Sequence, residues 1–193
     1  VALTNVTQAC SRIGMDIWRI ERPWTDENFS DAMAGLCESF PEFAASTRLM
    51  METQPHLARI LSGEVDATDV VFPSGSSELV SAFYNKGCDF LAYNELIKTT
   101  LHKLIESAPT RRPIRVLEVG AGTGSLTNAV LSVLPVERSE FTFTDISDLF
   151  IAGARQQLSG FNNVEYRTFD IEQPPDSQGF QPGGYDVVLA SNV

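Results

Sequence analysis

Basic residues are scarce in this sequence. Its 193 residues hold 14 lysines and arginines against 25 aspartates and glutamates, a formal net charge of −11. Nonspecific nucleic-acid binding needs a basic surface that displaces counterions from phosphates, so the composition argues against that function. No apolar run is long enough to span a bilayer, and no secretory leader is visible, so we expect no membrane partner.

Cysteine is scarce as well. Cys10, Cys37 and Cys88 are widely spaced and form no C-x-x-C pair, which argues against a disulfide framework or a zinc site. We therefore expect free thiols, a cytoplasmic location and no metal. The chain begins at Val1 rather than at methionine, which indicates a piece of a longer protein.

A glycine-rich stretch is the most informative feature present. It reads VLEVGAGTGSL from Val116 to Leu126. A β-branched run ends in Glu118, glycines follow at 120, 122 and 124, and a helix-forming segment comes next. This order predicts a strand, a tight turn and a helix N-terminus, where α/β sheets bind nucleotide-like ligands. Glycine permits positive φ and lets a ligand approach the backbone.

The residues around this loop bear on the ligand. A Walker lysine is absent, and Ser125 stands where a dinucleotide-binding loop has its third small residue, so an NAD(P)-binding reductase is disfavoured. Glu118, Asp145 and Asp170 each follow or end a predicted strand. Three carboxylates would repel a pyrophosphate and suit an ammonium, a sulfonium and a ribose diol. Alternatively, Asp145 and Asp170 are N-caps of following helices, although Ser147 is the better cap after Asp145.

Strand and helix patterns alternate in the second half of the chain. Strands are predicted at 114–119, 140–144, 164–169 and 185–190, with helices at 123–134 and 147–158 between them. This alternation predicts a parallel sheet with right-handed crossovers. Upstream, short helices reach to about residue 75, and a longer helix spans 89–107.

Two other groups of residues allow two interpretations each. Apolar residues at helical spacing predict a core stripe, or else the lining of an acyl-substrate cleft; they are Met50, Met51, Leu57, Ile60 and Leu61. Arg111, Arg112 and Arg115 form either a solvated approach to the first strand or a patch for an acidic carrier protein. His56 and His102 lie in helical patterns without a catalytic arrangement.

Several motifs, taken in order, resemble the C-methyltransferase domains of type I polyketide synthases. They are LEVGAGTG at 117–124, FTFTDIS at 141–147, DIEQPPDSQGF at 170–180 and DVVLASNV at 186–193. LSGEVD at 61–66, VFPSGS at 71–76 and the residues Phe83, Tyr84 and Asn94 fit the same family. The resemblance covers nearly the whole chain.

The resemblance implies a fold and a domain order. The fold is α/β, with the N-terminal part of a class I methyltransferase (Rossmann-like) parallel sheet preceded by a helical lid subdomain. Residues 1–88 would form the lid, and 89–193 would form the N-terminal part of the core that binds S-adenosylmethionine (SAM). The remaining C-terminal strands are expected outside this sequence.

The resemblance also implies an activity. A methyl group would pass from SAM to the α-carbon of a β-ketoacyl chain on the phosphopantetheine of an acyl carrier protein, among neighbouring synthase domains. Glu118 and residues 120–124 would hold the methionine moiety, Asp145 the ribose hydroxyls, and Asp170 and Ile171 the adenine. The full set of implied cofactor-binding residues is Tyr84, Glu118, Gly120, Ala121, Gly122, Thr123, Gly124, Asp145, Ile146, Asp170, Ile171 and Asn192.

One part of the family pattern is missing. The family's catalytic histidine follows the SNV segment, so it is expected beyond Val193, and the 193 residues alone are not expected to methylate. Two alternatives stay open: a pseudo-methyltransferase that only shapes the synthase, and an N- or O-methyltransferase of a similar assembly line.

Overall fold

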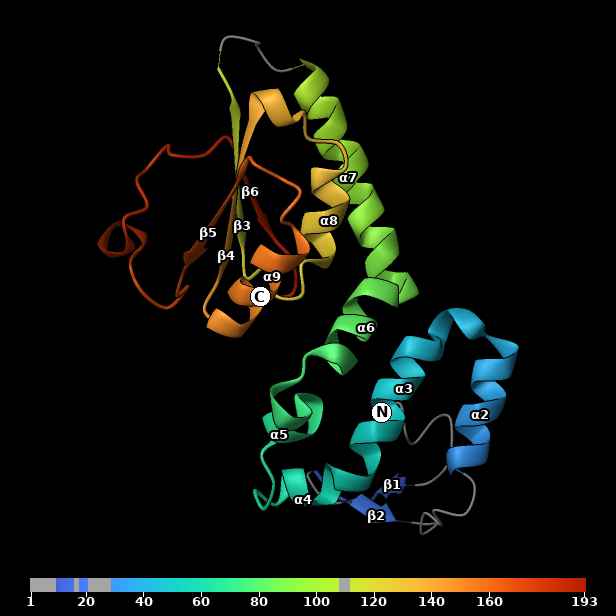
Figure 1. Cartoon of the computed structure of the whole chain (residues 1–193). Coiled ribbons are helices and arrows are strands. Elements are labelled where there is room, and N and C mark those ends of the chain that lie inside the picture. Colours follow the sequence, from blue (N-terminus) through green and yellow to red (C-terminus); the bar gives the residue numbers. More distant parts are fainter. Residues whose placement is uncertain (1–9, 16–17, 21–28, 108–111) are drawn as a thin grey trace.

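A helical region and a sheet with its covering helices make up the described part of the chain (Figure 1). The structure is a computed structural model that describes residues 10–15, 18–20, 29–107 and 112–193. It begins with the strands β1 (Cys10–Arg12) and β2 (Trp18–Ile20), which pair antiparallel. The helices that follow are α2 (Phe29–Ser39), α3 (Ala44–Thr53), α4 (Leu57–Leu61), α5 (Ala67–Val71), α6 (Glu78–Lys86) and α7 (Cys88–Ser107).

Four parallel strands form the sheet, in the order β5-β4-β3-β6. The elements of this part are β3 (Ile114–Val119), α8 (Ser125–Leu131), β4 (Ser139–Asp145), α9 (Asp148–Gln157), β5 (Val164–Thr168) and β6 (Val187–Ala190). The predicted alternation of strands and helices is therefore confirmed. Because the strands are parallel, their carboxyl ends meet at one edge of the sheet, where Glu118 pairs in register with Phe143.

Helices cover one face of the sheet. Val116, Phe141 and Phe143 point to this face and are at most 1% exposed. They belong to a core with apolar residues of α7, α8 and α9, and α7 and α8 lie side by side over it (Figure 1). Alternation along β3 turns Glu118 to this same face, and its side chain reaches α8.

A loop covers the opposite face. Leu117 and Val119 pack there with Phe169 and Phe180, and Phe180 belongs to the long connection between β5 and β6. The guanidinium of Arg167 lies 3.9 Å from the centre of the Phe180 ring. The central strand β3 is thus covered on both faces, which explains why apolar residues stand at consecutive positions 116 and 117 and again at 119.

The predicted apolar stripe on the early helices is wrong. Met50, Leu57 and Leu61 are 54%, 51% and 79% exposed, and none of the five residues lines the cavity beside the glycine-rich loop. The 3-10 turn at Gln54–His56, which contains Pro55, separates α3 from α4. Residues before and after it therefore do not share one helix face.

One smaller difference concerns a helix. The helix predicted at 123–134 is shorter, Ser125–Leu131, because Gly124 has a φ of 74° and cannot be helical. No described helix is long and apolar enough to cross a membrane.

An ion pair joins the start of β6 to the segment before β3. Arg112 donates to both carboxylate oxygens of Asp186, one of them at 2.7 Å, and the Arg115 backbone N–H donates at 2.9 Å. The bonds from Arg112 and then from Arg115 hold the pKa of Asp186 well below its usual range. Arg112 is thus engaged in the fold, while Arg111 lies outside the described residues.

We expect Asp186→Asn to lower the free energy of unfolding by about 1 kcal/mol, the upper end for partly exposed ion pairs. Because the pKa of Asp186 is lowered by folding, its contribution is present above about pH 4 and is lost as pH falls. Urea denaturation at pH 7 and pH 3 measures both effects, with exposed Glu140→Gln as control. An Asp186→Asn deficit that is equal at the two pH values would contradict this account.

Candidate functional site

The glycine-rich loop connects β3 to α8 through three residues in the left-handed region. Gly120, Gly122 and Gly124 have φ values of 59°, 54° and 74°, where a side chain is strained. A Cβ at Gly120 would lie 2.8 Å from the Val193 side chain, whereas one at Gly122 would meet only the Gly120 oxygen, at 3.8 Å. The backbone at Gly122 is therefore open to a ligand.

A buried carboxyl group lies beneath this loop. Glu118 is 2% exposed, and the hydroxyl of Thr127 on α8 donates to its Oε2 at 2.6 Å. Burial raises the pKa of Glu118 to about 8, and the bond from Thr127 opposes that rise. The Thr144 hydroxyl donates to the Glu118 carbonyl at 2.6 Å, so backbone and side chain are both held.

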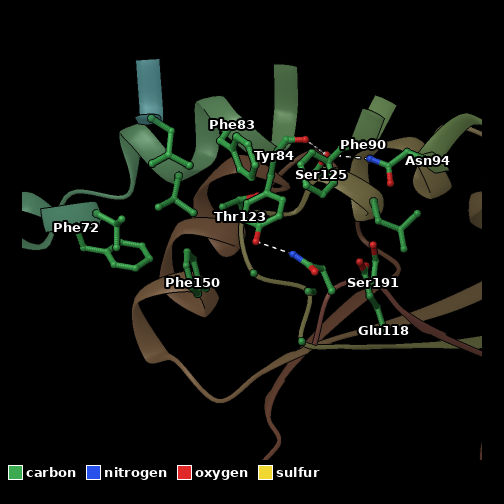
Figure 2. A pocket seen from close by; sticks show the side chains of 18 residues that line it. Phe72, Phe83, Tyr84, Phe90, Asn94, Glu118, Thr123, Ser125, Phe150 and Ser191 are labelled. Atoms are coloured by element: carbon green, nitrogen blue, oxygen red, sulfur yellow. Dashed lines mark hydrogen bonds between the residues drawn. The ribbon is translucent and has the colours of Figure 1, made fainter. Parts of the chain in front are cut away.

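A cavity of about 400 Å³ opens between the loop and the helical region (Figure 2). Its walls are mostly apolar: Leu49, Val71, Phe72, Val80, Phe83, Phe90, Leu126 and Phe150. The rings of Phe72 and Phe150 meet edge to face with centroids 5.9 Å apart, which connects the helical region to α9. Glu118 and the loop form its polar floor, and none of its lining residues is a lysine, arginine or histidine.

Hydrogen bonds cross from the helical region to the sheet at this cavity. The Asn192 side chain donates to the Tyr84 hydroxyl at 2.7 Å, and Asn192 itself has a φ of 61°. The Ser125 hydroxyl donates to the Tyr84 carbonyl at 2.8 Å, and Asn94 donates to Ser125 at 2.9 Å. Figure 2 shows these contacts above the loop. They hold α6, α7, the start of α8 and the residues after β6 around one space.

The structure brings together seven of the predicted cofactor-binding residues. Those lining the cavity are Tyr84, Glu118, Gly120, Ala121, Gly122, Thr123 and Asn192. Gly124, Asp145, Ile146, Asp170 and Ile171 lie outside its lining. These five follow the loop or the carboxyl ends of β4 and β5, along the same edge of the sheet.

Asp145 supports the loop from below. Its Oδ2 accepts from the Gly122 N–H and its Oδ1 from the Ser147 N–H, both at 2.8 Å. Ser147 holds the N-cap position of α9, but its side chain makes no capping bond. Ser147 therefore occupies the expected N-cap position without making the expected side-chain bond, and Asp145 bonds the N–H of Ser147 itself rather than an N–H within α9.

Asp170 is followed by a turn and caps no helix. Its Oδ1 accepts from the Glu172 N–H at 2.9 Å, and residues 171–173 form a turn. The N-cap interpretation of Asp170 is thus wrong. Ile146 and Ile171, which follow Asp145 and Asp170, are 65% and 63% exposed, so two apolar side chains stand open at this edge.

The predicted set of cofactor-binding residues leaves out several lining residues, above all Asn94, Ser125, Phe150 and Ser191. Asn94 had a readable signal, since it is a polar residue at helical spacing from the apolar positions Ile97 and Leu101. Phe150 had none, because nothing in its sequence surroundings distinguishes a cavity wall from a core position.

Neither histidine belongs to the cavity. His102 is on α7, 3.5 Å from Glu106, with its side chain 54% exposed. His56 lies in the turn between α3 and α4 and borders a separate surface hollow. No imidazole therefore faces the loop.

Comparison with known proteins gives consistent results. A family model for a methyltransferase domain matches residues 117–193. The chain is 34% identical over 179 residues to polyketide synthase PksM of Bacillus subtilis, covering 88% of this chain and 4% of PksM. It is 34% identical over 193 residues to polyketide synthase ThaQ of Burkholderia thailandensis, covering 96% of this chain and 9% of ThaQ.

A solved structure extends the comparison to the fold. The CurJ carbon methyltransferase superposes with a TM-score of 0.89 and 32% identity, over 99% of this chain and 50% of that one. This match confirms the predicted class I methyltransferase fold. The chain spans about half the length of that structure and less than a tenth of the two synthases.

We expect Glu118→Gln to stabilise the protein at alkaline pH. Folding raises the pKa of Glu118 from 4.5 to about 8, so the wild type is fully stable below the unfolded pKa and loses stability as pH rises toward the folded one. The variant avoids burying a charge. Its free energy of unfolding relative to that of the wild type should therefore rise by on the order of 3 kcal/mol between pH 5 and pH 8. Urea denaturation at both pH values, with exposed Glu165→Gln as control, measures this. A constant difference would mean that Glu118 is not buried as described.

Proposed function

We propose that this chain, which matches a methyltransferase-domain model over residues 117–193 and is similar to polyketide synthases and to a carbon methyltransferase of known structure, takes part in methylating the α-carbon of a β-ketoacyl chain. The acyl chain would be carried on the phosphopantetheine of an acyl carrier protein. The observation that carries this proposal is the apolar cavity that adjoins the glycine-rich loop and the Glu118 carboxyl group. Neighbouring synthase domains would deliver the carrier.

The site residues fit the cofactor, which is SAM. SAM supplies an electrophilic methyl group on a sulfonium. The open backbone at Gly122 leaves room for a ligand, and Glu118 offers a carboxylate to the ammonium of the methionine end. Asp145, at the end of β4, would accept the ribose hydroxyls with lone pairs that its two backbone bonds leave free. Ile146 and Ile171 would flank the adenine with their exposed apolar surfaces.

The charge of the cavity supports the same assignment. Its lining holds one carboxyl group and no cationic side chain, so it favours a ligand with positive groups. Binding such a ligand would favour the ionised form of Glu118, because an opposite charge nearby lowers a carboxyl pKa.

The apolar walls suit the acyl chain. Phe72 and Phe83 come from residues 1–88, Phe90 comes from α7 and Phe150 comes from α9. We propose that residues 1–88 act as a lid that forms most of the wall above the cofactor. Tyr84 and Asn192, which bond to one another at 2.7 Å, would lie where the methionine end meets the substrate.

Removal of the α-proton needs a base within hydrogen-bond reach. No histidine lines the cavity, and Glu118 is assigned to the cofactor. We therefore propose that the base comes from a residue outside these 193 residues.

The proposed activity predicts one product. The full-length protein, given SAM and a β-ketoacyl carrier protein, should add a methyl group at the α-carbon, detected by mass spectrometry of the released acyl-pantetheine. Fragmentation of that product should place the added mass at the α-carbon, which separates carbon from oxygen methylation. A methyl group on oxygen or nitrogen would overturn the acceptor, and SAM binding without any product would favour the pseudo-methyltransferase alternative.

The loop predicts a contrast between two glycines. Gly122→Ala places a methyl group in the open space of the site, so SAM affinity should fall at least tenfold, a cost of about 1.4 kcal/mol, while the circular dichroism spectrum stays near wild type. Gly120→Ala would collide with the Val193 side chain and should lower the unfolding temperature more than Gly122→Ala does. Unchanged SAM affinity in Gly122→Ala would show that the ligand does not approach this backbone.

A further inference from the structure

Asn94 is a buried polar residue on a helix otherwise attached to the core by apolar side chains. It lies in α7, is 5% exposed and lines the cavity. Burying an amide without partners is unfavourable, so both ends of this side chain need an explanation. One end has a partner in the protein, since Nδ2 donates to the Ser125 hydroxyl at 2.9 Å.

The hydrogen-bond chain determines which way the amide faces. The Ser125 hydroxyl has one hydrogen, and it goes to the Tyr84 carbonyl oxygen at 2.8 Å. That carbonyl can only accept. The Ser125 oxygen must therefore accept from Asn94, which requires the NH₂ group, and not the carbonyl, to face Ser125.

The carbonyl oxygen of Asn94 is consequently turned away from Ser125. Figure 2 shows it directed toward the side of the cavity where Glu118 lies. Within the described part of the chain, no donor bonds to this oxygen. The cavity thus presents a fixed, unpartnered acceptor in addition to the Glu118 carboxyl group.

We propose that Asn94 accepts a hydrogen bond from the ammonium group of the methionine end of SAM, as a second acceptor beside Glu118. This inference rests on the proposed function. An ammonium has three donors and no acceptor, enough for both Asn94 and Glu118, which line the same cavity. Ser125 then acts as a positioning residue, because its hydroxyl holds the amide in the accepting orientation.

The competing occupant is an amide N–H of the phosphopantetheine arm. The ammonium is favoured because Asn94 is hydrogen-bonded to Ser125, the first residue of α8, which directly follows the glycine-rich loop. The residue that sets the orientation of Asn94 is thus adjacent to the loop that would hold the cofactor.

The test compares two ligands on the full-length protein by calorimetry. S-adenosylhomocysteine carries the ammonium, and 5′-methylthioadenosine lacks the whole amino-acid end. Asn94→Ala should weaken S-adenosylhomocysteine about tenfold, as the loss of a hydrogen bond to a charged group does, and should leave 5′-methylthioadenosine unchanged. Asn94→Asp loses the donor to Ser125, but both carboxylate oxygens accept and carry negative charge, so the variant should retain affinity for the ammonium of S-adenosylhomocysteine. Exposed Thr100→Ala on the same helix is the control.

Three results would overturn the inference. The first is an equal loss of affinity for both ligands in Asn94→Ala. The second is an Asn94→Asp variant that binds S-adenosylhomocysteine as weakly as Asn94→Ala does. The third is an Asn94→Ala variant with normal S-adenosylhomocysteine affinity but a raised KM for the acyl carrier protein. If the wild type bound neither ligand, the proposed function itself would fail. The ligand pair therefore separates the two failures.

Discussion

The burial of the Glu118 carboxyl group is the constraint on which the rest of the site depends. A carboxyl group 2% exposed is costly unless it has partners or a cation arrives. Thr127 supplies one hydrogen bond from α8, and Thr144 holds the backbone of Glu118 from β4. The loop that follows turns sharply through glycines of positive φ, so α8 begins close enough for Thr127 to reach the acid. The sheet, the loop and the helix must therefore all be placed so that these hydrogen bonds to Glu118 can form.

The second part of the site is built by the helical region, which both hydrogen bonds and the Phe72–Phe150 ring contact join to the sheet and its helices. Tyr84 receives bonds from Asn192 after β6 and, at its carbonyl, from Ser125 at the start of α8. The rings of Phe83, Tyr84 and Phe90 pack against one another beside these bonds. Their centroids lie between 4.7 and 5.2 Å apart. An apolar chamber therefore lies directly against a polar floor that carries a single acid. This juxtaposition suits a reaction between a cationic cofactor and an apolar acyl chain.

Much of the sheet could be predicted from the sequence, because its signals are local. Strand β3, the loop glycines and Glu118 follow from a β-branched run that ends in E-x-G-x-G-x-G. The cavity walls could not be predicted, since Phe72 and Phe150 meet from positions far apart in the chain. The stripe from Met50 to Leu61 was misread because a proline-containing turn interrupts the helix. The backbone bonds of Asp145 were also not foreseeable, as they depend on how closely the loop approaches β4.

The most direct test of the central claim is a crystal structure of the full-length protein with S-adenosylhomocysteine. We expect the amino-acid end of the ligand in the cavity beside Glu118, the ribose at Asp145, and the adenine between Ile146 and Ile171. The sulfur should face the apolar walls contributed by the helical region. A ligand bound elsewhere, or one whose adenine fills the aromatic cavity while Glu118 faces no cationic group, would contradict it.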